Sequence, residues 1–435
     1  MERFALSRMK EWKETENRKP LIIRGARQVG KTWIMKTFGQ QYFEKTAYVN
    51  FDNNARMKQV FEGDLDIERL VLAISAETGV SIEAENTLII FDEIQEVPKA
   101  LTSLKYFYEN APQYAIVAAG SLLGVALHQG TSFPVGKVDF LDLYPLNFRE
   151  FLCAMGEKQF VSMLDSCDTQ MVTVFKTKYI ERLREYYFVG GMPEVVKDFS
   201  EKKDYNRVRA IQKNLINYYQ QDFSKHAEIK LVPRLNLVWN SIPMQLAKEN
   251  KKYIYGQVRE GSRAKDFELA IQWLLDCGLI HKVQRIQKPD LPLKAYIDFD
   301  AFKLFLVDIG LLIAMTDLDA KVIIEGNKIF TEFKGSLTEQ YILQQLISDV
   351  GVIPYYYSTQ NSKGEIDFLV QGKTSVIPIE VKAEENLKAK SLKAFCEKYQ
   401  PSYAVRTSMS DYREQDWMTN IPLYAIKWIE NYVNQ

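Results

Sequence analysis

The sequence predicts a multidomain α/β protein, and three features along the chain indicate it. Over the first 150 residues, short apolar runs alternate with helix-like stretches, the pattern of βα units and a parallel sheet. Helical periodicity then dominates from about residue 153 to residue 226. Near the C-terminus, helices flank further strand-like runs, which predicts a second α/β domain. We divide the chain into domains at residues 1–155, 156–228, 229–320 and 321–435.

Composition describes a well-folded chain and excludes several classes of protein. The 435 residues are 46% hydrophobic and carry 56 basic and 56 acidic side chains, so disorder is excluded for most of the length. Zero net charge also excludes a globally basic coat for nucleic acid, although not a local basic face. With 4 Cys far apart and 3 His, neither a disulfide framework nor a Cys- or His-based zinc site is expected.

The sequence has no predicted membrane segment. Its N-terminus is charged throughout, lacks the apolar core of a signal peptide, and predicts an amphipathic helix with Phe4, Met9 and Trp12 on one face. The apolar stretch at residues 114–127 is interrupted by Gly120 and is shorter than the ~20 residues that a spanning helix needs. We interpret this stretch as a buried strand and a short helix, in a cytoplasmic protein.

A phosphate-binding loop is the strongest motif in the chain. Residues 25–32 fit G-x-x-x-x-G-K-[ST] between a predicted strand and a predicted helix. Glycines let backbone amides curl around phosphate oxygens, and the helix N-terminus adds positive potential. Lys31 then reaches the β- and γ-phosphates of ATP, and the Thr32 hydroxyl ligates Mg²⁺. The predicted nucleotide contacts are Gly25, Ala26, Arg27, Gln28, Val29, Gly30, Lys31, Thr32 and Trp33.

Two acids at the end of a later strand predict the second half of this site. The apolar run at residues 87–91 ends in Asp92 and Glu93. Asp92 is expected to hold Mg²⁺ through water, and Glu93 to orient and deprotonate the attacking water. The alternative, a strand end with two solvated acids, is disfavoured because the phosphate loop lies in the same chain.

Other strands indicate which branch of P-loop proteins this is. A strand candidate at residues 47–51 lies between the two motifs, so the motif strands need not be adjacent. That arrangement, with Glu93 beside Asp92, marks the ATPase branch with an additional strand. A further strand ends near Ser121, which we expect near the γ-phosphate as a polar sensor. The alternative for Ser121 is an ordinary Gly-Ser turn.

Together these motifs resemble a widespread prokaryotic family of AAA-type P-loop ATPases. The resemblance covers nearly the whole chain and rests on residues 24–32, 91–95, 120–121, 144–151 and 190–193. It implies an ATPase domain, a helical lid at residues 156–228, and a C-terminal domain of unknown function with a nuclease-like end. In related signal-transduction ATPases a Gly-x-Pro element packs on adenine, which implies that Pro193 contacts the base. A helix-breaking turn is the alternative for Pro193.

An ATPase of this type often needs an arginine that stabilises the negative charge developing on the γ-phosphate. Such an arginine can lower the activation barrier by several kcal/mol. Arg149 and Arg234 are the two candidates, and the sequence does not choose between them. For Arg149 the alternative is an ion pair with a neighbouring acid.

The middle segment, residues 229–320, looks like a winged helix-turn-helix. Helices lead into an amphipathic helix that stops at Gly278, and a strand follows. Arg259, Arg263 and Lys265 would then contact DNA phosphates. Acidic residues are interspersed among them, so a protein-contact or lid domain is the alternative.

Near the C-terminus, two strands carry a pattern similar to the PD-(D/E)xK nuclease core. Asp367 lies on the first strand, and Glu380 and Lys382 share one face of the second. Glu339 on the preceding helix matches an additional acid of some members, while Ile366 replaces the Pro of the motif. The resemblance implies that the three acids hold a divalent metal and that Lys382 positions water. The alternative is a nuclease-like fold without cleavage.

Three hypotheses for function remain open, one of which is a nucleotide-binding scaffold without enzymatic activity. The first is an ATP-hydrolysing enzyme whose nucleotide state moves a C-terminal half that binds or cleaves DNA. The second is a nucleotide-dependent switch that binds a protein partner and whose nuclease-like domain is catalytically silent. The sequence also leaves open whether the chain forms a homo-oligomer.

Overall fold

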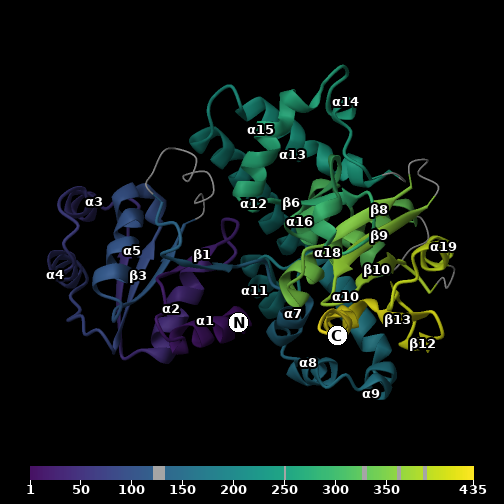
Figure 1. Cartoon of the computed structure of the whole chain (residues 1–435), viewed down its shortest axis with the longest axis horizontal. Helices are drawn as coiled ribbons and strands as arrows, with labels where there is room; N and C mark the ends of the chain where they lie inside the picture. The colour runs from purple at the N-terminus through teal and green to yellow at the C-terminus, as the bar shows by residue number, and fades with distance from the viewer. Residues whose placement is uncertain (121–132, 249–250, 326–330, 360–363, 386–388) are drawn as a thin grey trace. The chain divides into compact units, whose positions relative to one another are not determined.

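The computed structural model describes residues 1–120, 133–248, 251–325, 331–359, 364–385 and 389–435 (Figure 1). The chain divides into two compact units. The N-terminal unit consists of Glu2–Tyr144 together with Asp276–Gly278. The C-terminal unit consists of Pro145–Leu275 and Leu279–Gln435.

A five-stranded parallel sheet forms the centre of the N-terminal unit, with the order β2-β3-β4-β1-β5. Its strands are β1 (Leu21–Arg24), β2 (Lys45–Asn50), β3 (Thr87–Asp92), β4 (Ala115–Ala119) and β5 (Asp139–Asp142). The first four confirm the strands expected from the sequence. The short strand β5 was not expected, since only one of its four residues is buried and its pattern carries little signal.

Helices pack against this sheet and build its core. They are α1 (Ala5–Glu14), α2 (Lys31–Tyr42), α3 (Ala55–Glu62), α4 (Ile67–Thr78), the 3₁₀ turn η1 (Ile94–Glu96) and α5 (Pro98–Asn110). The predicted amphipathic N-terminal helix is present and buries Met9 and Trp12. All six residues of β3 are buried, as expected for an inner strand of a parallel sheet. On one face, the rings of Phe51, Phe61 and Phe91 meet edge to face.

The sheet order brings the two nucleotide motifs to one edge. Strand β4 lies between β1 and β3, so the motif strands are not adjacent, as predicted. The additional strand between them is β4, whereas the strand between the motifs in sequence, β2, lies at the edge. Because all five strands are parallel, the residues that follow β1, β3 and β4 meet at their carboxyl ends. Ser121 follows β4 but lies outside the described residues.

The C-terminal unit begins with a helical region, which confirms the helical periodicity from residue 153 to residue 226. Its helices up to the second sheet are α7 (Phe148–Ala154), α8 (Lys158–Asp165), α9 (Thr169–Val174), α10 (Lys176–Val189), α11 (Pro193–Lys202), α12 (Tyr205–His226), α13 (Val232–Leu246), α14 (Tyr255–Val258) and α15 (Ala264–Asp276). The last residue of α15, Asp276, already belongs to the N-terminal unit.

A mixed sheet of eight strands follows, in the order β12-β13-β11-β10-β9-β8-β6-β7. The strands are β6 (Ile280–Ile286), β7 (Ile297–Leu306), β8 (Tyr355–Ser358), β9 (Glu365–Gln371), β10 (Val376–Val381), β11 (Val405–Ser408), β12 (Arg413–Gln415) and β13 (Met418–Pro422). The remaining helical elements are η2 (Leu293–Tyr296), α16 (Ile309–Met315), α17 (Ala320–Ile324), α18 (Thr331–Gln345), η4 (Leu346–Val350), α19 (Lys390–Tyr399), η5 (Leu423–Ile429) and α20 (Glu430–Val433). Helix α18 and strands β9 and β10 lie where the sequence predicts them.

The predicted domain boundary at residue 320 is not a boundary in the structure. Strands β6 and β7 form an antiparallel pair, and β6 also pairs with β8, with Arg285 opposite Tyr356. The predicted winged-helix-like segment therefore contributes two strands to the same sheet as the C-terminal segment. Pairing between strands about 70 residues apart in sequence depends on loop closure and packing, which local periodicity does not record.

The described residues include no helix that is both long enough and apolar enough to cross a lipid bilayer.

Candidate functional site

The phosphate loop connects β1 to α2, and two of its glycines have conformations that other residues avoid. Gly25 has φ 147°, and a Cβ there would lie 2.1 Å from the carbonyl oxygen of Leu143. Gly30 is the N-cap of α2 in the left-handed region, at φ 95°. Both positions therefore require glycine. The helix that follows points its N-terminal amides at the same loop, which suits an anion.

Lys31 lies inside this loop with only 7% of its surface exposed. Its Nζ donates hydrogen bonds to the carbonyl oxygens of Gly25 at 2.9 Å and Ala26 at 2.8 Å. Burial lowers the pKa of Lys31 to about 8, although the charges of Glu93 and Asp92 act to raise it. At neutral pH the ammonium is therefore charged and poorly hydrated. A phosphate oxygen would compete strongly with the two carbonyl oxygens for its hydrogen bonds.

Thr32 and Asp92 meet directly, although they are 60 residues apart. Thr32 Oγ1 donates to Asp92 Oδ2 at 2.6 Å, and Asp92 is 3% exposed. Tyr48, which sequence reasoning missed, donates its hydroxyl to the same carboxylate oxygen at 2.9 Å. Tyr48 lies on β2, which pairs with β3 in a register that the sequence alone does not show. Burial, and then the charge of Asp92, raise the pKa of Tyr48 far above its ordinary value, so its hydroxyl stays protonated and can donate this hydrogen bond.

A hydroxyl and a carboxylate placed this close are oxygen ligands of the kind that Mg²⁺ prefers. The donor set therefore fits the predicted magnesium bound with ATP.

Glu93 adopts a left-handed backbone conformation, with φ 51° and ψ 44°. A residue other than glycine pays about 1–2 kcal/mol for this, and such strain is commonest at functional sites. The Glu93 carboxylate accepts a hydrogen bond from Gln95 Nε2 at 2.7 Å, and its backbone N–H donates to Asp92 Oδ1 at 3.1 Å. The acid is thus held in one orientation beside Asp92.

The other predicted nucleotide contacts differ in burial. Ala26 and Val29 are buried, so they offer backbone groups and not side chains. Gln28 is exposed and also left-handed, at φ 65°. Arg27 is partly buried, and Trp33 is 41% exposed on the first turn of α2. Trp33 is the large apolar surface beside the loop that a nucleotide could cover.

In the C-terminal unit, the Gly-Gly-Met-Pro motif has a packing role. A Cβ at Gly190 would lie 2.2 Å from Asp308 Oδ1, and a Cβ at Gly191 would lie 2.1 Å from Leu146 O. The buried carboxylate of Asp308 accepts the Gly191 N–H at 2.6 Å. Pro193 is the first residue of α11, a position that suits proline because no intrahelical donor is lost there. These contacts favour the helix-breaking turn over the adenine contact as the interpretation of Pro193.

Arg149, the predicted γ-phosphate arginine, is engaged by acids of its own unit. Its Nη1 lies 3.1 Å from Asp165 Oδ1 and 3.6 Å from Asp349 Oδ1, and its side chain is 12% exposed. The ion pairs of the alternative interpretation are thus present, and a role of Arg149 at the γ-phosphate stays a prediction. The other candidate, Arg234, is exposed on α13.

The predicted carboxylates of the C-terminal domain do come together, from one helix and two adjacent strands. Glu339 lies on α18, Asp367 on β9 and Glu380 on β10. Lys382 follows β10 directly, and its Nζ lies 2.6 Å from Glu380 Oε1. Asp367 Oδ2 accepts the backbone N–H of Val381 at 2.7 Å. Burial, and then the charge of Glu339, raise the pKa of Asp367 to about 8.

Two further lysines enter this cluster, and sequence reasoning missed both. Lys303 on β7 is 1% exposed; its Nζ forms an ion pair with Glu365 and lies 3.7 Å from Glu339 Oε2. Lys251 forms a second ion pair with Glu339. Burial would lower the pKa of Lys303, but the charges of Glu339 and Glu365 outweigh it and raise the pKa above its ordinary value. Both lysines come from segments distant in sequence, so no local pattern could have identified them.

With the lysines in place, the cluster does not fit the predicted divalent metal. Four carboxylates (Glu339, Glu365, Asp367 and Glu380) face three ammonium groups. Glu339 Oε2 and Glu380 Oε2 are buried without a hydrogen bond, but the ammonium of Lys303 already lies beside the first. Across the described residues, no group of three or more His, Cys, Asp or Glu side chains is arranged to hold a metal ion.

The basic residues predicted to contact DNA are exposed at the start of α15 and before it. Arg259, Arg263 and Lys265 all lie at the surface, together with exposed Glu260 and Glu268. Charges of both signs therefore share this face, which does not favour phosphate binding over a protein contact.

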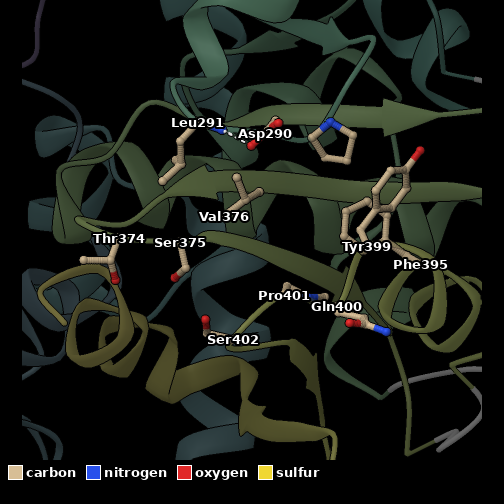
Figure 2. Close-up of a pocket in the computed structure, with 11 residues that line it drawn as sticks. Asp290, Leu291, Thr374, Ser375, Val376, Phe395, Tyr399, Gln400, Pro401 and Ser402 are labelled. Carbon is tan, nitrogen blue, oxygen red and sulfur yellow. Dashed lines mark hydrogen bonds between the residues drawn. The ribbon is translucent and has the colours of Figure 1, made fainter.

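A separate pocket of about 220 Å³ lies at the other end of the hairpin formed by β9 and β10 (Figure 2). The hairpin turn contributes Thr374 and Ser375, the end of α19 contributes Tyr399, and the loop before η2 contributes Asp290, whose carboxylate accepts the Leu291 N–H at 2.9 Å. None of the carboxylates of the cluster lines this pocket.

Three family models match successive parts of the chain. Residues 17–152 match an AAA domain, residues 180–322 match a domain of unknown function (DUF8612), and residues 334–426 match another domain of unknown function (DUF4143). No curated protein matches the chain. The first match covers most of the N-terminal unit, which is thus similar to an AAA domain, and the second match crosses the boundary predicted at residue 228.

Three solved structures are similar to the chain at low identity, and each matches 72% of it. They are a Walker-type ATPase of Pyrococcus abyssi (15% identity, 95% of that chain, TM-score 0.44), the Orc1 protein of Aeropyrum pernix in complex with DNA (13%, 91%, 0.27) and the Drosophila ORC bound to DNA (12%, 93%, 0.25).

Proposed function

We propose that the chain binds and hydrolyses ATP with Mg²⁺ at the phosphate loop. The contact between Thr32 Oγ1 and Asp92 Oδ2, 2.6 Å apart at the carboxyl ends of β1 and β3, carries this proposal. It joins the two motifs that nucleotide hydrolysis needs, with the buried ammonium of Lys31 beside them. The match of residues 17–152 to an AAA domain supports it.

Each side chain has a distinct part in the proposed reaction. Lys31 donates hydrogen bonds to the β- and γ-phosphate oxygens, which replace its hydrogen bonds to the carbonyl oxygens of Gly25 and Ala26. Thr32 and Asp92 hold Mg²⁺, which neutralises charge on the phosphates. Glu93 orients the attacking water and accepts its proton. The hydrogen bond from Gln95 restrains the orientation of the Glu93 carboxylate.

Calorimetric titration of Mg-ATP and a phosphate-release assay test this proposal. We expect Lys31→Ala to abolish both binding and turnover, and Glu93→Gln to bind ATP without turnover. Lys58→Ala, on the exposed face of α3, is a matched control that should behave as the wild type. The proposal is wrong if folded wild-type protein produces no binding heat, or if Glu93→Gln turns over ATP at the wild-type rate.

For the C-terminal unit, the observations favour a silent nuclease-like fold over an active one. The segment from α18 to β11 contains the helix α18, the turn η4, the strands β8, β9 and β10, the helix α19 and the strand β11. It brings Glu339, Asp367, Glu380 and Lys382 together, which supports a nuclease-like fold. The ammonium of Lys303 and its partner Lys251 occupy this cluster, which supports the absence of a metal-dependent reaction. We therefore favour a nucleotide-dependent switch that acts on a protein partner.

Incubation of the protein with supercoiled, linear and single-stranded DNA in Mg²⁺ or Mn²⁺ distinguishes the two forms. We expect no nicking beyond that of Asp367→Ala. Nicking that Asp367→Ala abolishes would establish the active form. Binding of DNA with a steep loss at higher salt would argue for a DNA partner instead of a protein partner.

A further inference from the structure

Arg3 is a buried arginine whose side chain reaches the phosphate loop from the segment before helix α1. Only 5% of its surface is exposed. Its Nη1 donates a hydrogen bond to the carbonyl oxygen of Val29, within the loop, at 3.0 Å. Its Nη2 donates to the carbonyl oxygen of Tyr144 at 2.6 Å. All three residues belong to the N-terminal unit, where one guanidinium thus joins two carbonyls that are distant in sequence.

The backbone on either side of this bridge is held in place by the same unit. Helix α1 begins shortly after Arg3 and buries its apolar face. Leu143, the residue before Tyr144, donates its N–H to the carbonyl oxygen of Arg24 at the end of β1, at 2.8 Å. The position of the guanidinium is therefore set by packed elements outside the loop, so it can serve as an anchor for the loop.

The anchored carbonyl belongs to the peptide that leads from Val29 into Gly30, the N-cap of α2. A trans peptide is planar, and its C=O and N–H point in opposite directions. Because Arg3 holds the Val29 carbonyl, the Gly30 N–H points to the opposite side of this peptide. In the proposed ATP site, that N–H is one of the donors to phosphate oxygens. Arg3 thus fixes the direction of a predicted nucleotide contact through the peptide bond.

Gly30 makes this peptide easy to turn over. Its φ is 95°, and glycine adopts positive and negative φ about equally well. Half a turn of the peptide plane changes ψ of Val29 and φ of Gly30, and the glycine offers little resistance to it. The flipped peptide would present a carbonyl oxygen to the phosphate, and the two would repel each other. A hydrogen bond from a charged donor is about twice as strong as a neutral one, so Arg3 selects the orientation that suits phosphate.

We infer that Arg3 is a positioning residue of the nucleotide site, and that its guanidinium holds the Val29–Gly30 peptide with the N–H available to a phosphate group. The inference rests on the proposed ATP site. A loop that is already in its binding conformation needs no reorganisation when ATP arrives, so Arg3 contributes to affinity. The Gly30 N–H serves the bound substrate and the transition state alike, so the loss of Arg3 should raise KM and change kcat little.

Two arginines of the same segment provide the test. Arg8 is exposed on α1 and donates to the carbonyl oxygen of Asp142 at 3.4 Å, so it also ties this segment to the end of β5, but through an acceptor outside the phosphate loop. In calorimetric titration with Mg-ATP, we expect Arg3→Ala to raise Kd by about tenfold or more, the fold-change that one hydrogen bond to a charged group supports. We expect Arg8→Ala to leave Kd unchanged. Phosphate release should show the same rise in KM for Arg3→Ala.

Added guanidinium ion gives a readout that loss of stability does not imitate. The ion can occupy the space left in Arg3→Ala and donate to the Val29 carbonyl. We expect guanidinium chloride, well below denaturing concentrations, to lower the Kd of Arg3→Ala toward the wild-type value and to leave wild type and Arg8→Ala unchanged. Because guanidinium weakens folding, a variant that is merely unstable would bind less well in its presence. Sodium chloride at the same concentration controls for ionic strength.

The outcomes separate this inference from the proposed function. Absence of binding heat in the wild type overturns both. A wild-type Kd in Arg3→Ala, an equal rise in Arg3→Ala and Arg8→Ala, or a rise that guanidinium deepens or leaves unchanged, overturns the positioning role and leaves the ATP site intact. If Arg3→Ala does not fold, Arg3→Lys replaces it. One ammonium lacks the planar fork that bridges two carbonyls, so its Kd should also rise, and a wild-type Kd would again overturn the role.

Discussion

Replacement of Lys303 by methionine tests most directly how the C-terminal charge cluster is held together. Lys303 is 1% exposed, pairs with Glu365 and lies 3.7 Å from Glu339. Methionine keeps the length of the apolar stem and removes the charge. Of the three lysines in the cluster, Lys251 and Lys382 would then remain beside Glu339, Glu365, Asp367 and Glu380.

Removal of one partner from a buried ion pair typically costs about 3–5 kcal/mol, because the other charge is left buried and uncompensated. With an m-value of roughly 3 kcal/mol per molar urea, the unfolding midpoint of the transition that reports the C-terminal unit should fall by about 1–2 M. Lys178→Met, which removes an exposed lysine paired with Glu181 at 3.0 Å, is the control and should cost under about 1 kcal/mol.

The double variant Lys303→Met, Glu365→Gln keeps the test informative if the single variant folds poorly. It removes one charge of each sign, so we expect it to be more stable than Lys303→Met alone. We also expect millimolar Mn²⁺ to raise the midpoint of Lys303→Met, because a cation can then enter the cluster, and to leave the wild type unchanged. A loss below about 1 kcal/mol in Lys303→Met, or equal Mn²⁺ stabilisation of wild type and variant, would refute the reasoning.

Three other changes have defined outcomes. Burial raises the pKa of Asp308 from 3.8 to about 6. The protonated carboxyl therefore contributes about 3 kcal/mol to the free energy of unfolding below pH ~4, and this contribution is lost as the pH rises through 6. Asp308→Asn should remove this pH dependence from the stability measured by urea unfolding. Tyr48→Phe removes a hydrogen bond to Asp92 and should slow ATP hydrolysis about tenfold, at a stability cost near 1 kcal/mol, measured by phosphate release and unfolding. Gly191→Ala places a Cβ 2.1 Å from Leu146 O and should destabilise the C-terminal unit by more than ~2 kcal/mol in thermal unfolding.

Each of these has its own control or contrary result. The pKa of Asp349 is also raised to about 6, but Asp349 is present in both the wild type and Asp308→Asn. If Asp308→Asn kept the wild-type dependence of stability on pH between 4 and 6, the contribution assigned to Asp308 would be wrong. Tyr106→Phe on α5 should not affect hydrolysis. For Gly191, the comparison is Gly256→Ala, because neither glycine has a positive φ and a Cβ at Gly256 meets no described heavy atom within 4 Å. Equal losses in the two variants would show that the contact with Leu146 is unimportant.

The AAA part of the protein was predictable because its signals are local. The phosphate loop is a contiguous run whose glycines, lysine and threonine each have one physical role, and the buried run of β3 leads directly into Asp92. Strand periodicity also placed Asp367 and Glu380 on neighbouring strands, which the pairing of β9 with β10 confirms. In each case the relevant residues are adjacent in sequence, and backbone geometry alone fixes their relation.

Tertiary structure decided what depends on residues distant in sequence. Tyr48 reaches Asp92 only because β2 pairs with β3 in one register, and the predicted winged-helix-like segment joins the second sheet only because β6 pairs with β8. Lys303 and Lys251 enter the carboxylate cluster from outside the motif, and they pair with acids that the local pattern shows without a partner.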